Sequence, residues 1–197
     1  QEAGTTETGS YDLNGATSAA ELRGVTRQPD ATWAIPTEDE WHKAAHHKND
    51  GDTDNYFDFP MGDDDRPSND LVDPDQGNNA TCYSNDYTIG GPYWHTEVGA
   101  HENSESPYGT FDQGGNVREW TEGLHDPGNG FQRLMQGGSY VDSPDRMEVS
   151  EYDFDESNSQ SAGVGFRLVQ VPEPLSLTLL AMGGMTLLRR PRRRGTR

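Results

Sequence analysis

The sequence predicts a loop-rich globular domain with little regular structure, followed by an apolar and basic tail. The 197 residues include 23 glycines and 12 prolines, only 30% are hydrophobic, and the mean hydropathy is −0.98. Such values approach those of disordered chains. Aromatic residues offset this tendency, because they stand at the boundaries of patterned segments and can supply a core: Trp33, Trp41, Trp94, Trp120, Tyr108, Phe111 and Phe166.

The elements follow in chain order. Residues 1–30 are rich in Gly, Thr, Ser and Ala, which predicts an irregular N-terminal segment before a domain over 31–170. Thr37 and Glu40 form a capping-box pattern at the start of a helix predicted over 38–48, and its acidic first turn suits the positive helix end. The Asp-, Asn-, Gly- and Pro-rich stretch 49–92 predicts a long loop, and composition alone does not decide whether it is ordered. Alternation then favours a short strand at 94–99, which is followed by a turn and short segment at 108–120 and by two further short strands at 133–140 and 164–169.

The tail, residues 171–197, reads Val-Pro-Glu-Pro, then an apolar run over 175–188, then six arginines. Fourteen residues are fewer than the roughly 20 that span a bilayer, but arginines can snorkel at one end. A buried C-terminal helix is the alternative, and six arginines beside a core would be hard to place. The order resembles the PEP-CTERM sorting signal. That resemblance implies an exported protein of the cell envelope or extracellular surface, a short transmembrane helix, and an exosortase-type enzyme as partner.

Charge divides the chain in the same way. It carries 15 Lys and Arg against 34 Asp and Glu; without residues 171–197, which hold 6 Arg and 1 Glu, 9 basic and 33 acidic residues remain, a balance of −24. So acidic a body repels phosphate, which excludes nucleic acid as a partner, and attracts cations such as Ca²⁺. Acidity that serves only solubility or salt adaptation is an equally good interpretation.

The single cysteine, Cys82, excludes an intramolecular disulfide and a cysteine-based zinc site, and we expect it to be buried and inert. Residues 1–26 lack the apolar core of a signal peptide. Since the tail indicates export, we expect the natural chain to begin further upstream.

Short blocks in fixed order carry a second resemblance. They are residues 34–45 (AIPTEDEWHKAA), 96–99 (TEVG), 106–109 (SPYG), 112–120 (DQGGNVREW), and 137–140 (GGSY) with 165–167 (GFR). Together they resemble the formylglycine-generating enzyme, or sulfatase-modifying factor, family over about 32–168, without that family's usual opening segment. The resemblance implies a loop-rich α+β fold, similar to C-type lectins, with a small antiparallel sheet and few short helices. The apolar run would add a C-terminal hydrophobic helix.

Residues 112–119 suit calcium. Asp112 and Glu119 offer carboxylates, and the glycines between them let the backbone turn to present the carbonyls of Gly115 and Val117, which together supply the mixed oxygen ligands that Ca²⁺ prefers. The family resemblance implies calcium ligands at these four positions. The alternative is that Asp112 caps a turn and Glu119 pairs with Arg118 or Arg133. A second calcium site is a weaker expectation within 78–88, where the available oxygens belong to Asn79, Thr81 and Asp86.

Catalysis is where the sequence departs from the family. The family's oxidases bind copper with two cysteines, and one cysteine cannot supply two, so copper is not expected and no catalytic residue is assigned. His42 and His46 lie four apart on the predicted helix, but they lack the glutamate of a metalloprotease motif and are expected to be structural.

Two function classes remain open. The favoured one is a calcium-stabilised, non-catalytic surface or matrix module, with Tyr83, Tyr93 and Trp94 stacking on a cell-surface glycan or a peptide. The other is a formylglycine-generating oxidase that modifies a sulfatase cysteine.

Overall fold

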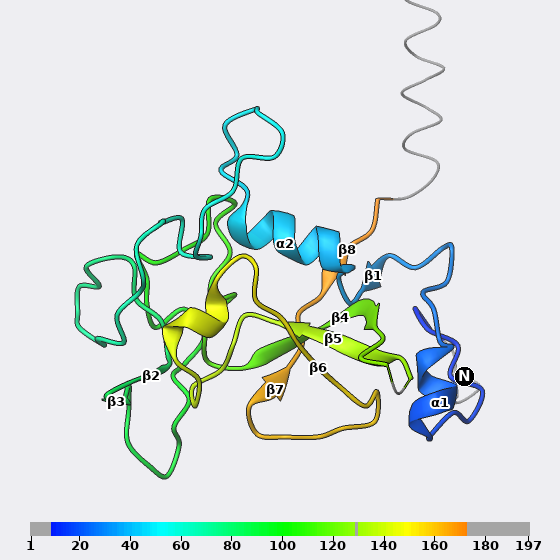
Figure 1. The fold of residues 1–197 in the computed structure, drawn as a ribbon. Coiled ribbons are helices and arrows are strands. Elements are labelled where there is room, and N and C mark those ends of the chain that lie inside the picture. Colours follow the sequence, from blue (N-terminus) through cyan, green and yellow to red (C-terminus); the bar gives the residue numbers. More distant parts are fainter. Residues whose placement is uncertain (1–8, 129, 173–197) are drawn as a thin grey trace, which may run out of the picture.

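The computed structural model describes residues 9–128 and 130–172 and is built around one mixed sheet (Figure 1). Its strand order is β6 (Asp153–Asp155), β5 (Gln132–Gln136), β4 (Arg118–His125) and β7 (Val164–Gly165). The β4–β5 and β5–β6 pairs are antiparallel, whereas β4 and β7 run parallel. The expected α+β, loop-rich character is confirmed, but the small sheet that was expected to be antiparallel is mixed, because β7 joins it in parallel.

Two small pairs complete the strands. β1 (Trp33–Ala34) pairs with β8 (Val169–Gln170), which brings the start of the predicted domain beside its end. β2 (Tyr83–Ser84) and β3 (Asp86–Tyr87) form a tight hairpin.

The predicted helix is present as α2, Glu38–His46, two residues shorter than expected. The Thr37 hydroxyl accepts the amide of Glu40, and the Glu40 carboxylate accepts the amide of Thr37, which confirms the capping box. The helix lies across one face of the sheet and packs against β4 (Figure 1). Trp41 and Ala45 are buried on that side, so the helix presents its apolar stripe to the sheet.

The strand predictions fail where glycine or a left-handed residue intervenes. No strand forms at 94–99, because Trp94 and Gly99 take φ of 61° and 73°. The strand expected over 133–140 ends at Gln136, since Gly137 and Gly138 have φ of 90° and 64°. The stretch 164–169 contributes to two different sheets instead of one strand.

The N-terminal segment contains more structure than its composition indicates. Within its described part, α1 (Ala19–Arg23) begins at a second capping box made by Ser18 and Glu21, and Tyr11 bridges to Arg27. The apolar run and arginine cluster at 173–197 lie outside the described residues. Among the described residues, no helix is long and apolar enough to cross a membrane.

The long loop of residues 49–92 is held by side-chain hydrogen bonds around Asp75, which is only 4% exposed. Its carboxylate accepts hydrogen bonds from the Gly77 amide, the Asn79 side chain, the Asn103 amide and the Ser104 hydroxyl at 2.6–3.2 Å. Burial raises the pKa of Asp75, but these donors outweigh it and hold the pKa below its usual range. Hydrogen bonds to the buried Asp75 carboxylate thus order this loop in the absence of a helix or long strand.

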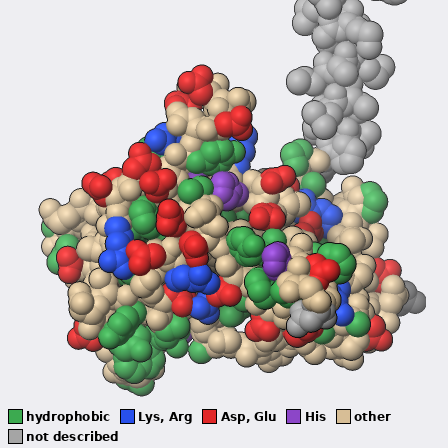
Figure 2. Space-filling view, in the orientation of Figure 1, with side chains coloured by type: hydrophobic (Ala, Val, Ile, Leu, Met, Phe, Trp, Pro, Cys, Tyr) green, Lys and Arg blue, Asp and Glu red, His purple; other side chains and the backbone are tan. Residues whose placement is uncertain are grey.

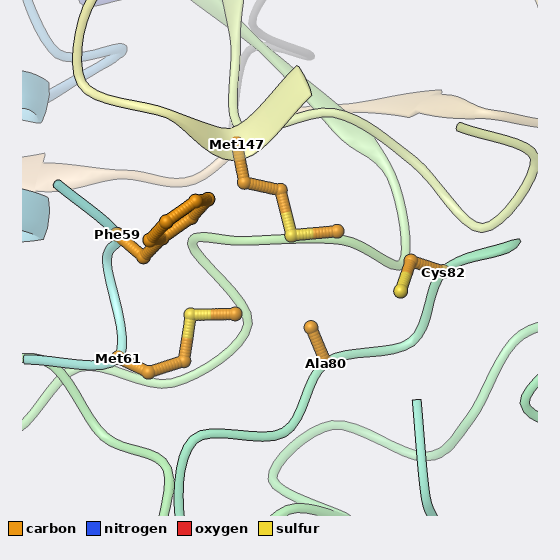
Figure 3. Packing of buried hydrophobic residues seen from close by; sticks show 5 residues of the cluster. All are labelled: Phe59, Met61, Ala80, Cys82 and Met147. Carbon is orange, nitrogen blue, oxygen red and sulfur yellow. The ribbon is translucent and has the colours of Figure 1, made fainter. Parts of the chain in front are cut away.

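A small sulfur-rich core lies between this loop and the 3₁₀ helix η1 (Pro144–Met147). It consists of Phe59, Met61, Ala80, Cys82 and Met147, whose side chains converge in Figure 3. The Cys82 thiol is fully buried, which raises its pKa to about 12. The burial expected for this thiol is confirmed, and its raised pKa disfavours the reactive thiolate.

Candidate functional site

The segment that carries the predicted calcium residues is a tight backbone crossing next to β4. Asp112, Gly115 and Asn116 have φ of 56°, 80° and 59°. The Gly115 amide donates to the Gly137 carbonyl at 2.8 Å, and the Asn116 amide donates to the Thr81 carbonyl at 2.7 Å. A β-carbon on Gly115 would collide with that Thr81 carbonyl. The glycines of this segment therefore permit three stretches of chain to meet.

Glu119 leaves this crossing on β4 and is 5% exposed. Its carboxylate pairs with the Arg167 guanidinium, with one contact from Nη2 to Oε1 at 2.7 Å and another from Nε to Oε2. The Trp41 indole nitrogen also donates to Oε2, at 2.7 Å. Glu119 thus pairs with an arginine, but the partner is Arg167, 48 residues along the chain, and Arg118 and Arg133 were the wrong predictions. The ion pair thus ties α2, β4 and the end of the domain together.

The structure separates the roles of the two predicted calcium carboxylates. Asp112 Oδ2 accepts the Gly99 amide at 2.7 Å, an interaction that fixes a loop. A carboxylate has about four acceptor positions, and the protein already fills three on Glu119. One position therefore remains for a metal, beside a guanidinium that repels cations. Among the described residues no group of three or more His, Cys, Asp or Glu is placed to hold a metal ion. Calcium at Asp112, Gly115, Val117 and Glu119 stays a prediction.

The second expected calcium site is spread between the interior and the surface. Asn79 and Thr81 are buried and bonded to protein partners, Asn79 to Ser68 and Asp75 and Thr81 to Thr96. Asp86 is exposed on β3. This site also stays a prediction, and the structure adds no contact among its three oxygens.

The helix histidines have structural partners. His42 Nε2 donates to the Val149 carbonyl at 3.1 Å, and His46 Nδ1 donates to the Phe57 carbonyl at 3.2 Å. Because a carbonyl only accepts, these contacts fix which ring nitrogen carries the proton. His46 is 2% exposed, and burial, with His42 as a smaller contribution, lowers its pKa to about 3. Both histidines therefore anchor loops to α2, in line with the expected structural role.

A group of aromatic side chains gathers where β2, β3 and the following loop meet residue 140. Ring centroids lie 5.0 Å apart for Tyr83 and Tyr87, 4.6 Å for Tyr87 and Trp94, and 4.4 Å for His95 and Tyr140, with the rings edge-to-face. We call Tyr83, Tyr87, Trp94, His95 and Tyr140 the aromatic cluster. Figure 2 shows hydrophobic side chains gathered at the lower left, over the β2–β3 region.

The sequence pointed to Tyr83, Tyr93 and Trp94 but missed the other members of this cluster. Tyr87 is brought in by the β2–β3 hairpin and Tyr140 by the turn after β5, and no local pattern pairs them. Trp94 takes a left-handed φ of 61°, which is rare for a bulky residue and is found most often at functional sites. Gly91 leaves room for its indole, because a β-carbon there would lie 2.9 Å from the ring.

A groove of about 570 Å³ lies beside the aromatic cluster. Tyr93, which is 77% exposed, and His95 line it, together with polar Thr96 and Glu97. Leu71 and Ile89 form its apolar wall. Its size and its mixture of apolar surface with a few polar groups are typical of small-ligand sites.

Comparison with known proteins settles the family. The model of the sulfatase-modifying factor enzyme 1-like domain matches residues 9–172, which is most of the chain. The chain belongs to this family. The resemblance seen in the sequence blocks is thereby confirmed for the domain, and the match takes in α1 and the N-terminal strand bridge as well.

Solved structures share the fold. The crystal structure of CarF aligns with a TM-score of 0.51 at 21% identity, over 77% of this chain and 52% of that one. Treponema denticola variable protein 1 aligns with a TM-score of 0.54 at 23% identity, over 78% and 53%. The chain thus spans about half the length of these relatives, and at such identities the likeness concerns the fold alone. No curated protein sequence gives a significant match.

Proposed function

We propose that this sulfatase-modifying-factor-like domain is an exported, non-catalytic binding module that holds carbohydrate on the aromatic cluster and in the adjoining groove. The observation that carries the proposal is the groove itself, which is lined by the largely exposed Tyr93 and shares His95 with the aromatic cluster. Aromatic rings offer large, rigid apolar faces at little entropic cost, which suits the C–H faces of sugar rings. His95, Thr96 and Glu97 provide hydrogen-bonding groups for hydroxyls beside those faces.

The non-catalytic part rests on sulfur chemistry. The chain has one cysteine, and that thiol is buried in an apolar cluster with a raised pKa. Two thiolates are needed for the copper site that the family resemblance implies for oxidases, so Cys82 cannot form it alone. The competing proposal, a formylglycine-generating oxidase, requires purified protein with copper to convert a sulfatase-peptide cysteine to formylglycine. Mass spectrometry of that peptide separates the two.

Calcium stabilisation belongs to the same proposal. The ion would take one Asp112 oxygen, the carbonyls of Gly115 and Val117, and the one remaining acceptor position of Glu119, with water completing six to eight oxygens. At free Ca²⁺ of about 100 times Kd, the native state gains about 2.7 kcal/mol by mass action. Calorimetric titration should then show uptake that Asp112→Ala abolishes, and an absence of heat with the native protein would remove calcium from the proposal.

Export and surface placement rest on the Pro-Glu-Pro triplet, the apolar run and the arginine cluster of residues 171–197. We propose that an exosortase-type enzyme processes this tail. Expression with and without residues 173–197, followed by fractionation, tests this part. If both versions partition identically, the tail does not sort the protein.

The glycan proposal is tested on an array of cell-surface and matrix polysaccharides. Tyr93→Ala should reduce binding about tenfold or more, since loss of a stacked ring costs on the order of 1.4 kcal/mol or more. Tyr152→Ala is the matched control, because Tyr152 is 42% exposed and lies outside the aromatic cluster and groove. An array without any binder, or equal losses in the two variants, contradicts carbohydrate binding at this site.

A further inference from the structure

A second cavity, of about 410 Å³, lies where the N-terminal segment folds against the central sheet. Figure 1 shows α1 beside the ends of β4 and β5 in this region. Leu13, Leu22 and Val25 from the N-terminal segment face Ile35 and Trp120 across it. Most of the lining is apolar, so an occupant would gain from burying an apolar body there.

Arg133, on β5, is the cation of this cavity, and it differs from the other cations of the domain. Residues 9–172 contain nine Lys and Arg, of which seven form ion pairs with carboxylates: Arg23, Arg27, Lys48, Arg66, Arg118, Arg146 and Arg167. The remaining two are Lys43, which is exposed, and Arg133, which is half-buried. Within the described chain, Arg133 is therefore the one partly desolvated cation without a carboxylate partner, in a body with a large excess of acids.

Arg133 makes two hydrogen bonds, which use only part of its N–H donors. Its Nη1 donates to the Glu122 carbonyl at 3.0 Å and its Nη2 to the Leu22 carbonyl at 3.2 Å. A guanidinium has five N–H donors, so these two bonds fix its orientation and leave further donors available to a ligand. Burial lowers the pKa of Arg133 by more than the nearby Glu122 carboxylate raises it, which reflects the cost of holding this charge away from water.

The nearest carboxylate is committed elsewhere. Glu122 Oε1 accepts from the Tyr11 hydroxyl at 2.7 Å and from Arg27 Nε at 3.0 Å, and no ion pair joins it to Arg133 in the described chain. A second polar group also lacks a partner: Ser157, which lines the cavity, has a buried hydroxyl with no hydrogen bond to any described residue. In the described part of the protein, a cation without a carboxylate partner and a buried hydroxyl without a hydrogen bond therefore border one apolar cavity. A buried hydroxyl with no partner is costly unless a ligand or water completes it.

We propose that this cavity binds a small amphipathic carboxylate, with its anionic head on Arg133 and its apolar body against Leu13, Leu22, Val25 and Trp120. The head supplies the missing counter-ion in a site that is partly shielded from solvent, where such pairing is stronger than in water. An eight-carbon monocarboxylate has the chemistry required, whereas an alcohol or an amine of the same length lacks the charge or carries the wrong one. This site is separate from the aromatic cluster and does not depend on the glycan proposal.

Isothermal titration with octanoate, octanol and octylamine tests the proposal on the full chain. Octanoate should bind one site, and the other two should bind at least about tenfold more weakly, a difference of about 1.4 kcal/mol. Arg133→Met should lower octanoate affinity at least about tenfold, whereas Lys43→Met, which removes the exposed unpaired cation, should leave it unchanged. Equal affinity for octanol, or an unchanged affinity in Arg133→Met, overturns the proposal.

Because Arg133 also donates to two backbone carbonyls, the Arg133→Met variant could lose octanoate binding through misfolding. Val25→Trp provides an independent test, since a large ring on this lining residue fills the cavity and leaves Arg133 in place. It should abolish octanoate binding while keeping the thermal transition of the native protein. Octanoate binding that survives in Val25→Trp places the ligand elsewhere and refutes the assignment.

Discussion

Replacing Glu119 by Gln tests how much stability the buried ion pair contributes apart from any bound cation. Gln has the same shape and retains one oxygen to accept from the Trp41 indole, but it carries no charge. The side chains of Glu119 and Arg167 are 7% and 21% exposed, so the substitution leaves a largely buried guanidinium without its partner.

The structure sets the expected size of the effect. Breaking a buried pair by removing one partner costs about 3–5 kcal/mol. Arg167 keeps a hydrogen bond to the Phe111 carbonyl at 3.1 Å and some exposure, which favours the lower end, about 3 kcal/mol. For a domain of this size that corresponds to a fall in Tm of about 6–12 °C. Adding Arg167→Met to the variant should recover part of the loss, because the orphaned charge is then removed.

Urea denaturation in calcium and in chelator provides the assay. Glu40→Gln is the control: Gln is also accepted in a capping box, and the Glu40–Arg27 pair is 43% exposed on the carboxylate side, so the loss should stay below about 1 kcal/mol. The ion pair predicts that the Glu119→Gln loss of about 3 kcal/mol is present in chelator, and the calcium proposal adds a further loss in calcium-containing buffer. A loss confined to calcium-containing buffer, or one no larger than that of Glu40→Gln, refutes the ion-pair interpretation.

Three further predictions test the histidine, the backbone crossing and the thiol. The pKa of His46 is about 6.5 in the unfolded chain and about 3 in the folded protein, so between these pH values the unfolded state binds one more proton. The free energy of unfolding should therefore fall as pH drops below 6.5, by about 2 kcal/mol at pH 5 in urea titrations, and His46→Gln should remove this pH dependence. Gly137→Ala should lower the free energy of unfolding by about 3 kcal/mol in thermal melting, because its β-carbon would strike the Gln113 carbonyl. Gly99→Ala, with φ of 73° and open space around it, should lower it by only about 1–2 kcal/mol, and equal losses would refute the clash. Cys82 should react with a thiol reagent only as fast as the protein unfolds, and rapid native labelling would show that the thiol is accessible.

Local signals in the sequence were reliable where the physics is local. The capping box at Thr37 and Glu40 needs only four consecutive residues, and it placed the start of α2 correctly. The same pattern at Ser18 and Glu21 was available in the sequence and would have predicted α1, but the Gly- and Thr-rich surroundings favoured an irregular interpretation. The composition of the segment thus led to a wrong prediction, although the capping-box pattern indicated a helix start.

Interactions between distant residues could not be predicted in this way. The expected partner of Glu119 was Arg118 or Arg133, whereas Arg167 is brought to it by the parallel pairing of β7 with β4. Likewise, the alternation at 94–99 favoured a strand, but no neighbouring strand pairs with it in the described structure, and Trp94 instead joins the aromatic cluster. Register and sheet partners come from tertiary packing, which a single sequence does not contain.

The acidity of the domain has a structural explanation beside solubility. In the loops, aspartates repeatedly accept backbone amides that have no strand or helix partner, as Asp50 does for Asp52, Asp64 for Asp58, and Asp75 for Gly77 and Asn103. A chain with so little regular structure must satisfy its amides in this way, and a short charged acceptor does so strongly. The hydrogen bonds hold the pKa of these carboxyls below their usual range, so the charges are part of how the loops fold. High negative charge in this domain is therefore no evidence by itself for calcium, and a cation site has to be argued from oxygens that the loops leave free.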